Sequence, residues 1–207
     1  MNDKELKRLQ DLKQIESELL KKNISNICGI DEAGRGPLAG PVVVASVIMP
    51  ESSMIEGVND SKKLSPKKRD KLYEQITKEA ISYSVGIIDE KEIDEINILN
   101  ATKKALTKSL EKLEVKPKYI LVDALDNIDT LGIPFEGIIK GDAKVYGIAC
   151  ASIIAKVTRD KIMEQYDKIY PQYEFIQHKG YGTAKHIEAI KQYGACDIHR
   201  KTFIRRF

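Results

Sequence analysis

Two adjacent acids and a glycine-rich turn form the stretch of this sequence best suited to chemistry. An apolar run ends in Asp31 and Glu32, and the turn Gly34-Arg35-Gly36 follows one residue later. Carboxylate oxygens bind hard divalent cations such as Mg²⁺ or Mn²⁺. A turn with glycines on both sides of an arginine exposes backbone N–H groups beside a guanidinium, and this combination suits a phosphate. The stretch therefore indicates metal-assisted chemistry on a phosphodiester.

Two further apolar segments also end in acids, Asp123 and Asp142. The ends of strands in one sheet lie close in space even when they are far apart in sequence, so these carboxylates can converge on Asp31 and Glu32. Clustered carboxylates repel one another unless protons or cations compensate. Two divalent ions roughly 3.5–4 Å apart can activate a water and stabilise the leaving oxygen of a phosphodiester. Because neighbouring strand residues point to opposite faces, we expect the first strand to end or bend near Gly34.

The composition predicts an ordinary soluble globular protein. The chain has 207 residues, of which 42% are hydrophobic and 31% charged, and this length suits one large domain with at most small appendages. The net charge of +3 does not by itself indicate a nucleic-acid partner, although it allows a local basic face.

The cysteines, the N-terminal residues and the short apolar runs predict the cellular compartment of the protein. Cys28, Cys150 and Cys196 are widely spaced and form no Cys-x-x-Cys pair, so the sequence supports neither a zinc site nor a disulfide framework. The N-terminal residues lack the apolar core of a signal peptide, and no apolar run is long enough to span a membrane. We therefore expect a cytoplasmic protein in a reducing compartment.

Hydrophobic periodicity predicts an α/β chain. Ser65 is a good N-cap and Pro66 suits the first helical position, so one helix should begin there. The expected strands span residues 27–33, 42–49, 81–88, 118–122 and 136–140, and the expected helices span residues 2–22, 65–80, a stretch that ends before Pro117, 145–168 and 185–193.

A dinucleotide-binding loop is an alternative interpretation of the glycine-rich turn. The spacing here is G-x-G-x-x-x-G rather than G-x-G-x-x-G. Pro37 and Pro41 would also disrupt the helix that should follow such a loop. A nucleotide-binding α/β protein is therefore the weaker reading.

Seven motifs together resemble the ribonuclease HII family. They appear in family order and cover nearly the whole chain beyond about the first 25 residues. The motifs are GIDEAGRGPLAGPVVVA at 29–45, DSKKLS at 60–65, LVDAL at 121–125, KGDAK at 140–144, ACASIIAKVTRD at 149–160, HKGYGTAKH at 178–186 and HRKTF at 199–203.

The resemblance implies a fold and an activity. The fold would be a ribonuclease H-like mixed sheet flanked by helices, with residues 1–25 as an N-terminal helical extension and residues 26–207 as the catalytic domain, including a small C-terminal helical portion. The activity would be endonucleolytic cleavage of RNA in RNA–DNA hybrids and at single ribonucleotides in duplex DNA, as in ribonucleotide excision repair, leaving a 3′-hydroxyl and a 5′-phosphate. Two Mg²⁺ or Mn²⁺ ions would act during catalysis. The catalytic and metal-binding residues would be Asp31, Glu32, Asp123 and Asp142.

The resemblance also assigns residues to the substrate. It places Gly34, Arg35 and Gly36 at the ribose 2′-hydroxyl, which is both a donor and an acceptor, and it stacks Tyr181 on the next deoxyribose. Individual surface lysines are usually only solvated, yet one serine and several basic residues of these motifs are candidates for phosphate contacts. Those candidates are Ser61, Lys62, Lys63, Lys144, Lys156 and Arg159, and we expect phosphate contact or capping for His178, His186 and His199.

Two alternatives and two partner predictions accompany this assignment. Ribonuclease HIII usually carries a sizeable N-terminal substrate-binding domain, which the first 25 residues cannot form. A catalytically inactive hybrid-binding module is disfavoured because all four carboxylates are present. We expect a monomer that binds RNA–DNA hybrids and ribonucleotide-containing duplexes, without a membrane partner. The ending IRRF lacks the glutamine and paired aromatics of a sliding-clamp peptide, so we expect no such motif.

Overall fold

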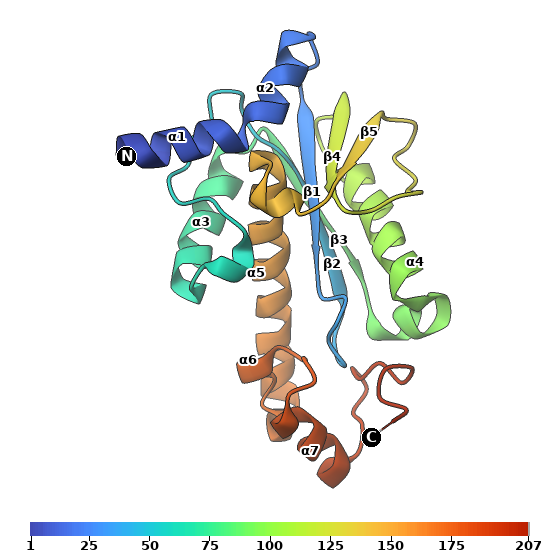
Figure 1. Ribbon diagram of the computed structural model, residues 1–207. Coiled ribbons are helices and arrows are strands. Elements are labelled where there is room, and N and C mark those ends of the chain that lie inside the picture. The colour runs from blue at the N-terminus through green and yellow to red at the C-terminus, as the bar shows by residue number, and fades with distance from the viewer. Residues whose placement is uncertain (207) are drawn as a thin grey trace.

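The computed structural model describes residues 1–206, which contain a five-stranded mixed sheet in the order β3-β2-β1-β4-β5 (Figure 1). β1 pairs antiparallel with β2 and parallel with β4, β2 is antiparallel to β3, and β4 is parallel to β5. The strands are β1 Ile27–Ala33, β2 Val42–Ile48, β3 Ser82–Ile88, β4 Tyr119–Asp123 and β5 Phe135–Ile138.

Helices cover both faces of this sheet, with α5 on one face and α4 on the other (Figure 1). This arrangement confirms the predicted mixed sheet flanked by helices. The helices are α1 Asp3–Leu12, α2 Gln14–Lys21, α3 Pro66–Glu79, α4 Glu90–Glu111, α5 Tyr146–Ile169, α6 Phe175–His178 and α7 Ala184–Tyr193, and the 3₁₀ turns are η1 Ser61–Lys63, η2 Gly141–Ala143 and η3 Pro171–Tyr173. Among residues 1–206 no helix has the length and apolar character needed to cross a membrane.

Strand β2, which lies between β3 and β1, is buried on both faces, which explains its nearly continuous apolar sequence. Ala45 and Val47 belong to the core beneath α5, whereas Val42 and Val44 belong to the core beneath α4. Successive side chains of a strand alternate between the two faces, so one strand of branched residues supplies both cores.

The small residues at the start of α5 allow a close backbone crossing with β1. A Cβ atom on Gly29 would lie only 2.1 Å from the backbone carbon of Gly147. This crossing sets β1 against the first turn of α5, and it lies two residues before Asp31 on one side and five residues after Asp142 on the other.

The N-terminal region differs from the sequence prediction. A single helix over residues 2–22 is wrong, because Lys13 leaves helical geometry and separates α1 from α2. The Lys13 ammonium instead donates hydrogen bonds to the carbonyl oxygens of Glu51 (2.6 Å) and Ser53 (3.0 Å). The boundary at residue 25 between an extension and a catalytic domain stays a prediction.

Most other elements lie within two residues of their predicted bounds. Helix α3 is capped by Ser65 and begins at Pro66, as predicted. Strand β5 ends at Ile138 rather than at residue 140, because Lys140 adopts a left-handed backbone conformation (φ 58°) that leads into η2. The small C-terminal portion is formed by α6 and α7, which pack at the far end of α5 (Figure 1).

Candidate active site

Three elements place the four acids together at one edge of the sheet. β1 and β4 are parallel, with Ile30 opposite Val122, so Asp31 and Asp123 follow at the same edge. The backbone N–H of Gly141 donates a 2.6 Å hydrogen bond to Asp123 Oδ1, and this bond holds η2 against the end of β4. Asp142 follows Gly141 in η2, and Glu32 follows Asp31 in β1.

Burial and mutual repulsion raise the pKa values in this cluster. The pKa of Asp31 is raised well above its usual range by burial and by the charges of Glu32 and Asp123. Burial also raises the pKa of Glu32, against the lowering effect of Arg35. The pKa of Asp142 is raised by burial and by Asp60 and Asp123. Burial and the neighbouring carboxylates therefore disfavour the ionised forms of these acids.

This donor set fits divalent metal ions, because it consists only of carboxylate oxygens. Within residues 1–206, no group of three or more acidic, histidine or cysteine side chains is already closed around a single ion position. A bound cation would offset the repulsion between these like-charged groups.

Lys62 is one of the cations that face this cluster, together with Arg35. Burial acts to lower its pKa, but the charges of Asp142, Asp31, Asp60 and Glu32 outweigh burial and raise the pKa. Asp60 is an additional acid at the site that the sequence analysis did not assign. The DSKKLS motif contained that signal, since Asp60 precedes the two lysines and caps η1 through the N–H of Lys62 (2.9 Å).

Ser61 does not lie where the sequence analysis placed it. We expected a phosphate contact, but Ser61 is buried and its hydroxyl bonds to that of Ser152 at 2.8 Å. A hydrogen bond from Ser152 in turn lowers the pKa of Asp31. The two serines therefore support the Asp31 carboxylate, and the expectation for Ser61 is corrected.

The Gly-Arg-Gly turn begins where β1 ends, as expected. Gly34 has φ +100°, a left-handed conformation that favours glycine, and a Cβ atom there would lie 2.2 Å from Arg159 Nε. Arg35 is exposed and its guanidinium lies 3.5 Å from Glu32. The turn therefore presents the exposed guanidinium of Arg35 beside the acids, while buried arginine side chains hold its backbone in place.

Two buried arginines hold this turn from below. Arg200 is fully buried and donates to the carbonyl oxygens of Gly34 (2.6 Å), Arg35 (3.0 Å) and Gly40 (2.8 Å). Burial lowers the pKa of Arg200 to about 9. Sequence reasoning missed this role, although the HRKTF motif contains the residue.

Arg159 is the second buried arginine, and the expected phosphate contact is wrong. Only 1% of Arg159 is exposed, and its guanidinium donates to the carbonyl oxygens of Pro41 (2.9 Å), Ala39 (3.0 Å) and Lys179 (2.9 Å). Burial lowers its pKa to about 10. Each of its three side-chain nitrogens donates to a backbone carbonyl, so Arg159 is a positioning residue for the loops rather than a ligand for phosphate.

Tyr181 lies beside the Gly-Arg-Gly turn. The residue is 43% exposed, and its Cε1 atom lies 3.8 Å from the position that a Cβ atom on Gly36 would take. The ring is therefore available to a substrate that also reaches the turn.

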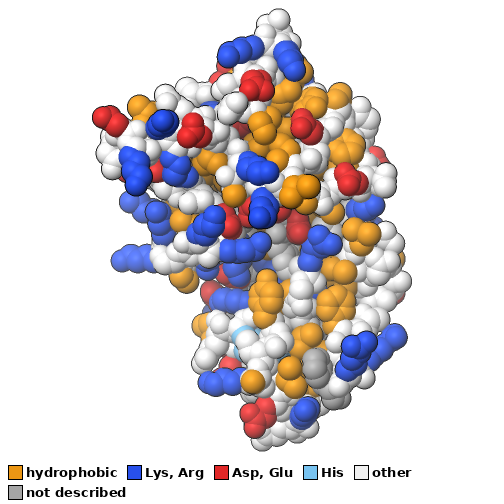
Figure 2. All heavy atoms as spheres, in the orientation of Figure 1, with side chains coloured by type: hydrophobic (Ala, Val, Ile, Leu, Met, Phe, Trp, Pro, Cys, Tyr) orange, Lys and Arg blue, Asp and Glu red, His pale blue; other side chains and the backbone are white. Residues whose placement is uncertain are grey.

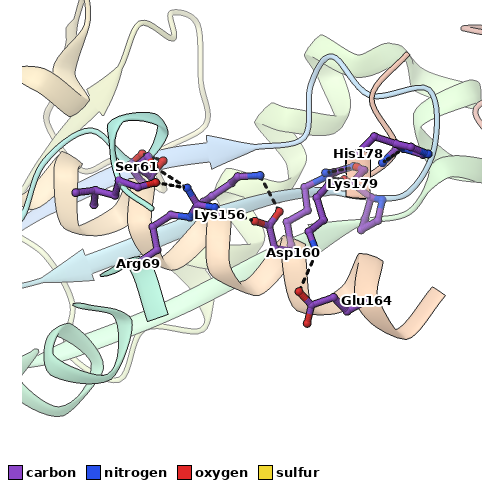
Figure 3. A network of polar contacts seen from close by, with 12 residues as sticks. Ser61, Arg69, Lys156, Asp160, Glu164, His178 and Lys179 are labelled. Carbon is purple, nitrogen blue, oxygen red and sulfur yellow. Dashed lines mark hydrogen bonds and ion pairs between the residues drawn. The ribbon is translucent and has the colours of Figure 1, made fainter. Parts of the chain in front are cut away.

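A polar groove of about 790 Å³ runs from α3 across α5 to Tyr181. Three ion pairs lie in this groove (Figure 3). Asp160 pairs with Lys156 (2.7 Å) and with Arg69 (3.6 Å). Lys179 pairs with Glu164 (2.8 Å). Figure 2 shows basic side chains around a patch of acidic ones near the middle of the face in view. Lys62, Lys63 and Lys144 are exposed.

The three histidines do not face solvent. His178, His186 and His199 are all buried, and their rings are packed against one another and against Phe175. Phosphate contact is therefore wrong for these buried residues, but the capping alternative fits His178 and His199, whose Nδ1 atoms accept hydrogen bonds from the backbone N–H groups of Gly180 (3.2 Å) and Cys196 (2.9 Å).

Known structures share this architecture. Ribonuclease H2 from Pyrococcus horikoshii OT3 matches with a TM-score of 0.74 and 31% sequence identity, over 87% of this chain and 95% of that one. The ribonuclease HII of Archaeoglobus fulgidus, solved in a complex with PCNA, matches with a TM-score of 0.74 and 28% identity over the same shares of the two chains. The sheet with clustered acids at its strand ends thus defines a nuclease of the ribonuclease H-like fold.

Sequence comparison narrows this class. The family model described as Ribonuclease HII matches residues 28–206. Ribonuclease HII of Caldicellulosiruptor saccharolyticus is 56% identical over 93% of this chain and 93% of that protein, and that of Ruminiclostridium cellulolyticum is 53% identical over 100% of this chain and 80% of that protein. The chain belongs to the ribonuclease HII family. It is an endoribonuclease that acts on the RNA of RNA–DNA hybrids.

Proposed function

We propose that Asp31, Glu32, Asp123 and Asp142 bind two divalent ions, Mg²⁺ or Mn²⁺, and that these four residues are the catalytic set. The observation that carries this proposal is their convergence at one edge of the sheet with raised pKa values for Asp31, Glu32 and Asp142. When bound, the ions would supply an activated water and stabilise the leaving 3′-oxygen, which gives a 3′-hydroxyl and a 5′-phosphate.

The residues of this chain would each contribute to that reaction. Ser152 stabilises the ionised form of Asp31 through its hydrogen bond. The N–H of Gly141 fixes one oxygen of Asp123, which leaves its other oxygen for a ligand. Lys62 offsets part of the negative charge that an approaching phosphate would otherwise meet.

We further propose that Gly34, Arg35 and Gly36 detect the ribose 2′-hydroxyl. Arg200 already occupies the carbonyl groups of Gly34 and Arg35. Among residues 1–206, the backbone N–H groups of Arg35 and Gly36 have no hydrogen-bond acceptor, so these donors suit a hydroxyl oxygen. A backbone without Cβ atoms at Gly34 and Gly36 also allows a sugar to approach closely.

Tyr181 extends this contact to the next nucleotide. Its exposed ring lies beside Gly36, so it would stack on the deoxyribose that follows the ribonucleotide, and cleavage at a single ribonucleotide in DNA would depend on it. Lys62 and Lys156 would contact backbone phosphates along the groove, where Lys156 is held by Asp160 until a phosphate competes.

The N-terminal helix α2 contacts α5, the long helix on one face of the sheet. Residues 1–25 would be an extension that supports a catalytic domain of residues 26–207, because α2 places Glu16 against the N-terminus of α5 through the Gly147 N–H (3.0 Å). The protein would act as a monomer in the cytoplasm.

The test uses a DNA duplex that contains one ribonucleotide, incubated with the protein in Mg²⁺ or Mn²⁺, with and without EDTA. We expect a single cut that leaves a 3′-hydroxyl and a 5′-phosphate, and no cut with EDTA. Cleavage that persists in EDTA, or a product with a 2′,3′-cyclic phosphate, would refute the proposed mechanism.

A further inference from the structure

The C-terminal segment around His199 and Arg200 lies between the two loops that face the substrate. It pairs with the chain after the Gly-Arg-Gly turn: the Arg200 N–H donates to the Leu38 carbonyl (2.8 Å), and the Gly40 N–H donates to the Ile198 carbonyl (2.8 Å). Neighbouring side chains of an extended segment point in opposite directions. His199 and Arg200 can therefore reach different loops from adjacent positions.

Arg200 reaches the Gly-Arg-Gly turn. Its guanidinium fork binds the carbonyl oxygens of Gly34, Arg35 and Gly40 at 2.6–3.0 Å. The planar, five-donor guanidinium can serve several carbonyls at once, which a lysine ammonium on a flexible chain cannot do with the same geometry. Arg200 thus supplies the side-chain hydrogen bonds to the carbonyl groups of Gly34 and Arg35 in the turn.

His199 reaches the Tyr181 loop through His186. The Nε2 atoms of the two rings lie 3.0 Å apart, and His186 Nδ1 lies 2.9 Å from the Tyr181 carbonyl oxygen. A carbonyl oxygen only accepts, so His186 carries its hydrogen on Nδ1 and accepts at Nε2 from His199. His199 Nδ1 then accepts from the Cys196 N–H (2.9 Å).

Both rings of this relay are neutral. The hydrogen bond between the two Nε2 atoms needs one donor and one acceptor. A second proton on His186 would sit on its Nε2 atom and place two hydrogens between the rings. Burial lowers the pKa of His186 to about 4, with the neighbouring histidines acting in the same direction, and burial also lowers that of His199. The relay therefore keeps one fixed hydrogen-bond direction.

The two loops also contact each other directly. The Leu38 N–H donates to the Gly180 carbonyl (2.8 Å), and a Cβ atom on Gly180 would lie 2.6 Å from the Ala39 carbonyl oxygen. The Tyr181 ring consequently has a defined position next to Gly36.

We propose that His199 and Arg200 are positioning residues that fix the spacing between the Gly-Arg-Gly turn and Tyr181, and thereby set the preference for a single ribonucleotide in DNA over a continuous hybrid. This inference rests on the proposed roles of that turn and of Tyr181. Two groups that read adjacent nucleotides must keep the spacing of those nucleotides, and a displacement of about 1 Å can reduce the rate about a hundredfold.

The experiment compares kcat/KM on two substrates of one sequence, a duplex with a single ribonucleotide and a uniform RNA–DNA hybrid. His199→Phe keeps a ring but removes the donor to His186, and His199→Gln restores a donor. We expect His199→Phe to lower the ratio of single-ribonucleotide to hybrid cleavage about tenfold, and His199→Gln to recover part of it. Arg200→Lys should also lower the ratio, and the exposed Arg205→Lys is its matched control.

Tyr181→Ala, measured on the same two substrates, tests the role of Tyr181 separately from the roles of His199 and Arg200. If it leaves the ratio unchanged, the proposed role of Tyr181 is wrong and this inference fails with it. If it lowers the ratio but His199→Phe lowers both substrates equally or neither, Tyr181 keeps its role and the positioning inference is overturned. In the double variant Tyr181→Ala/His199→Phe we expect no further loss of ratio, because His199 acts through Tyr181. The two His199 variants decide the question even if Arg200→Lys does not fold.

Discussion

Asp123 accepts a 2.6 Å hydrogen bond from the backbone N–H of Gly141, and this bond joins the end of β4 to the turn that carries Asp142. Two of the four clustered acids are thus held in register without a metal ion. Burial and neighbouring carboxylates raise the pKa values of Asp31 and Asp142, so a cation bound between the acids would favour their ionised forms.

Divalent ions should therefore stabilise the folded protein. An ion that binds the native acids but not the unfolded chain at a concentration 100 times its dissociation constant adds about 2.7 kcal/mol to the free energy of unfolding. We expect Mg²⁺ or Mn²⁺ to raise the melting temperature, measured by calorimetry with matched ionic strength. Asp142→Asn should reduce the shift, whereas Asp126→Asn, an exposed acid outside the cluster, should leave it intact. An equal shift in both variants would contradict a metal site at this edge.

Gly34→Ala should destabilise the protein more than Gly132→Ala, because both glycines have positive φ but only Gly34 is tightly packed. Gly34 has φ +100° and its missing Cβ would lie 2.2 Å from Arg159 Nε, whereas Gly132 has φ +78° with nothing within 4 Å. The left-handed conformation alone costs about 1–2 kcal/mol for alanine, so Gly132→Ala should lose about that amount. Gly34→Ala should lose about 3 kcal/mol or more, because overpacking adds to it. Denaturant unfolding measures both, and equal losses would show that the contact with Arg159 is unimportant.

Glu16 should make the stability depend on pH in an identifiable way. Burial raises its pKa from 4.5 to about 7, against the lowering effects of Lys13 and of the Gly147 N–H. The folded protein then holds a proton that the unfolded chain has released, so this group's contribution to stability falls as pH rises from about 4.5 to about 7, by at most about 1.4 kcal/mol per pH unit.

Glu16→Gln removes this titration. We expect the free energy of unfolding of the variant, minus that of the native protein, to increase with pH across that window, as measured by urea unfolding at several pH values. Glu18→Gln on the exposed side of α2 is the control and should show no such trend. A pH-independent difference for Glu16→Gln would mean that the Glu16 carboxyl titrates alike in both states.

The sequence predicted the parts of this molecule that depend on local pattern. The strands, the capped start of α3 and the convergence of Asp31, Glu32, Asp123 and Asp142 follow from apolar runs that end in acids, and the structure places these acids together. Strand ends of one sheet meet wherever the connections run, which is why this inference needed no tertiary detail.

The arginines show where such reasoning stops. Arg159 and Lys156 stand three positions apart in one motif, yet only Arg159 is buried. Arg159 and Arg200 both bond to backbone carbonyls more than a hundred positions away, such as those of Pro41 and Gly34. Carbonyl groups are the same at every residue, so no sequence pattern marks them as partners. The break at Lys13 has the same origin, because its ammonium binds carbonyls of a distant loop.

The central claim is that the four carboxylates carry the cleavage. Its most direct test is the initial rate at which Asp123→Asn cleaves a duplex with one ribonucleotide in saturating Mg²⁺ or Mn²⁺, compared with the native protein. Asparagine keeps the acceptor for the Gly141 N–H, so circular dichroism and the metal-free melting temperature should change little. We expect the rate to fall by about a hundredfold to a thousandfold, the magnitude typical when a preorganised electrostatic group is lost. A folded Asp123→Asn protein that retains most of its cleavage rate would contradict the claim.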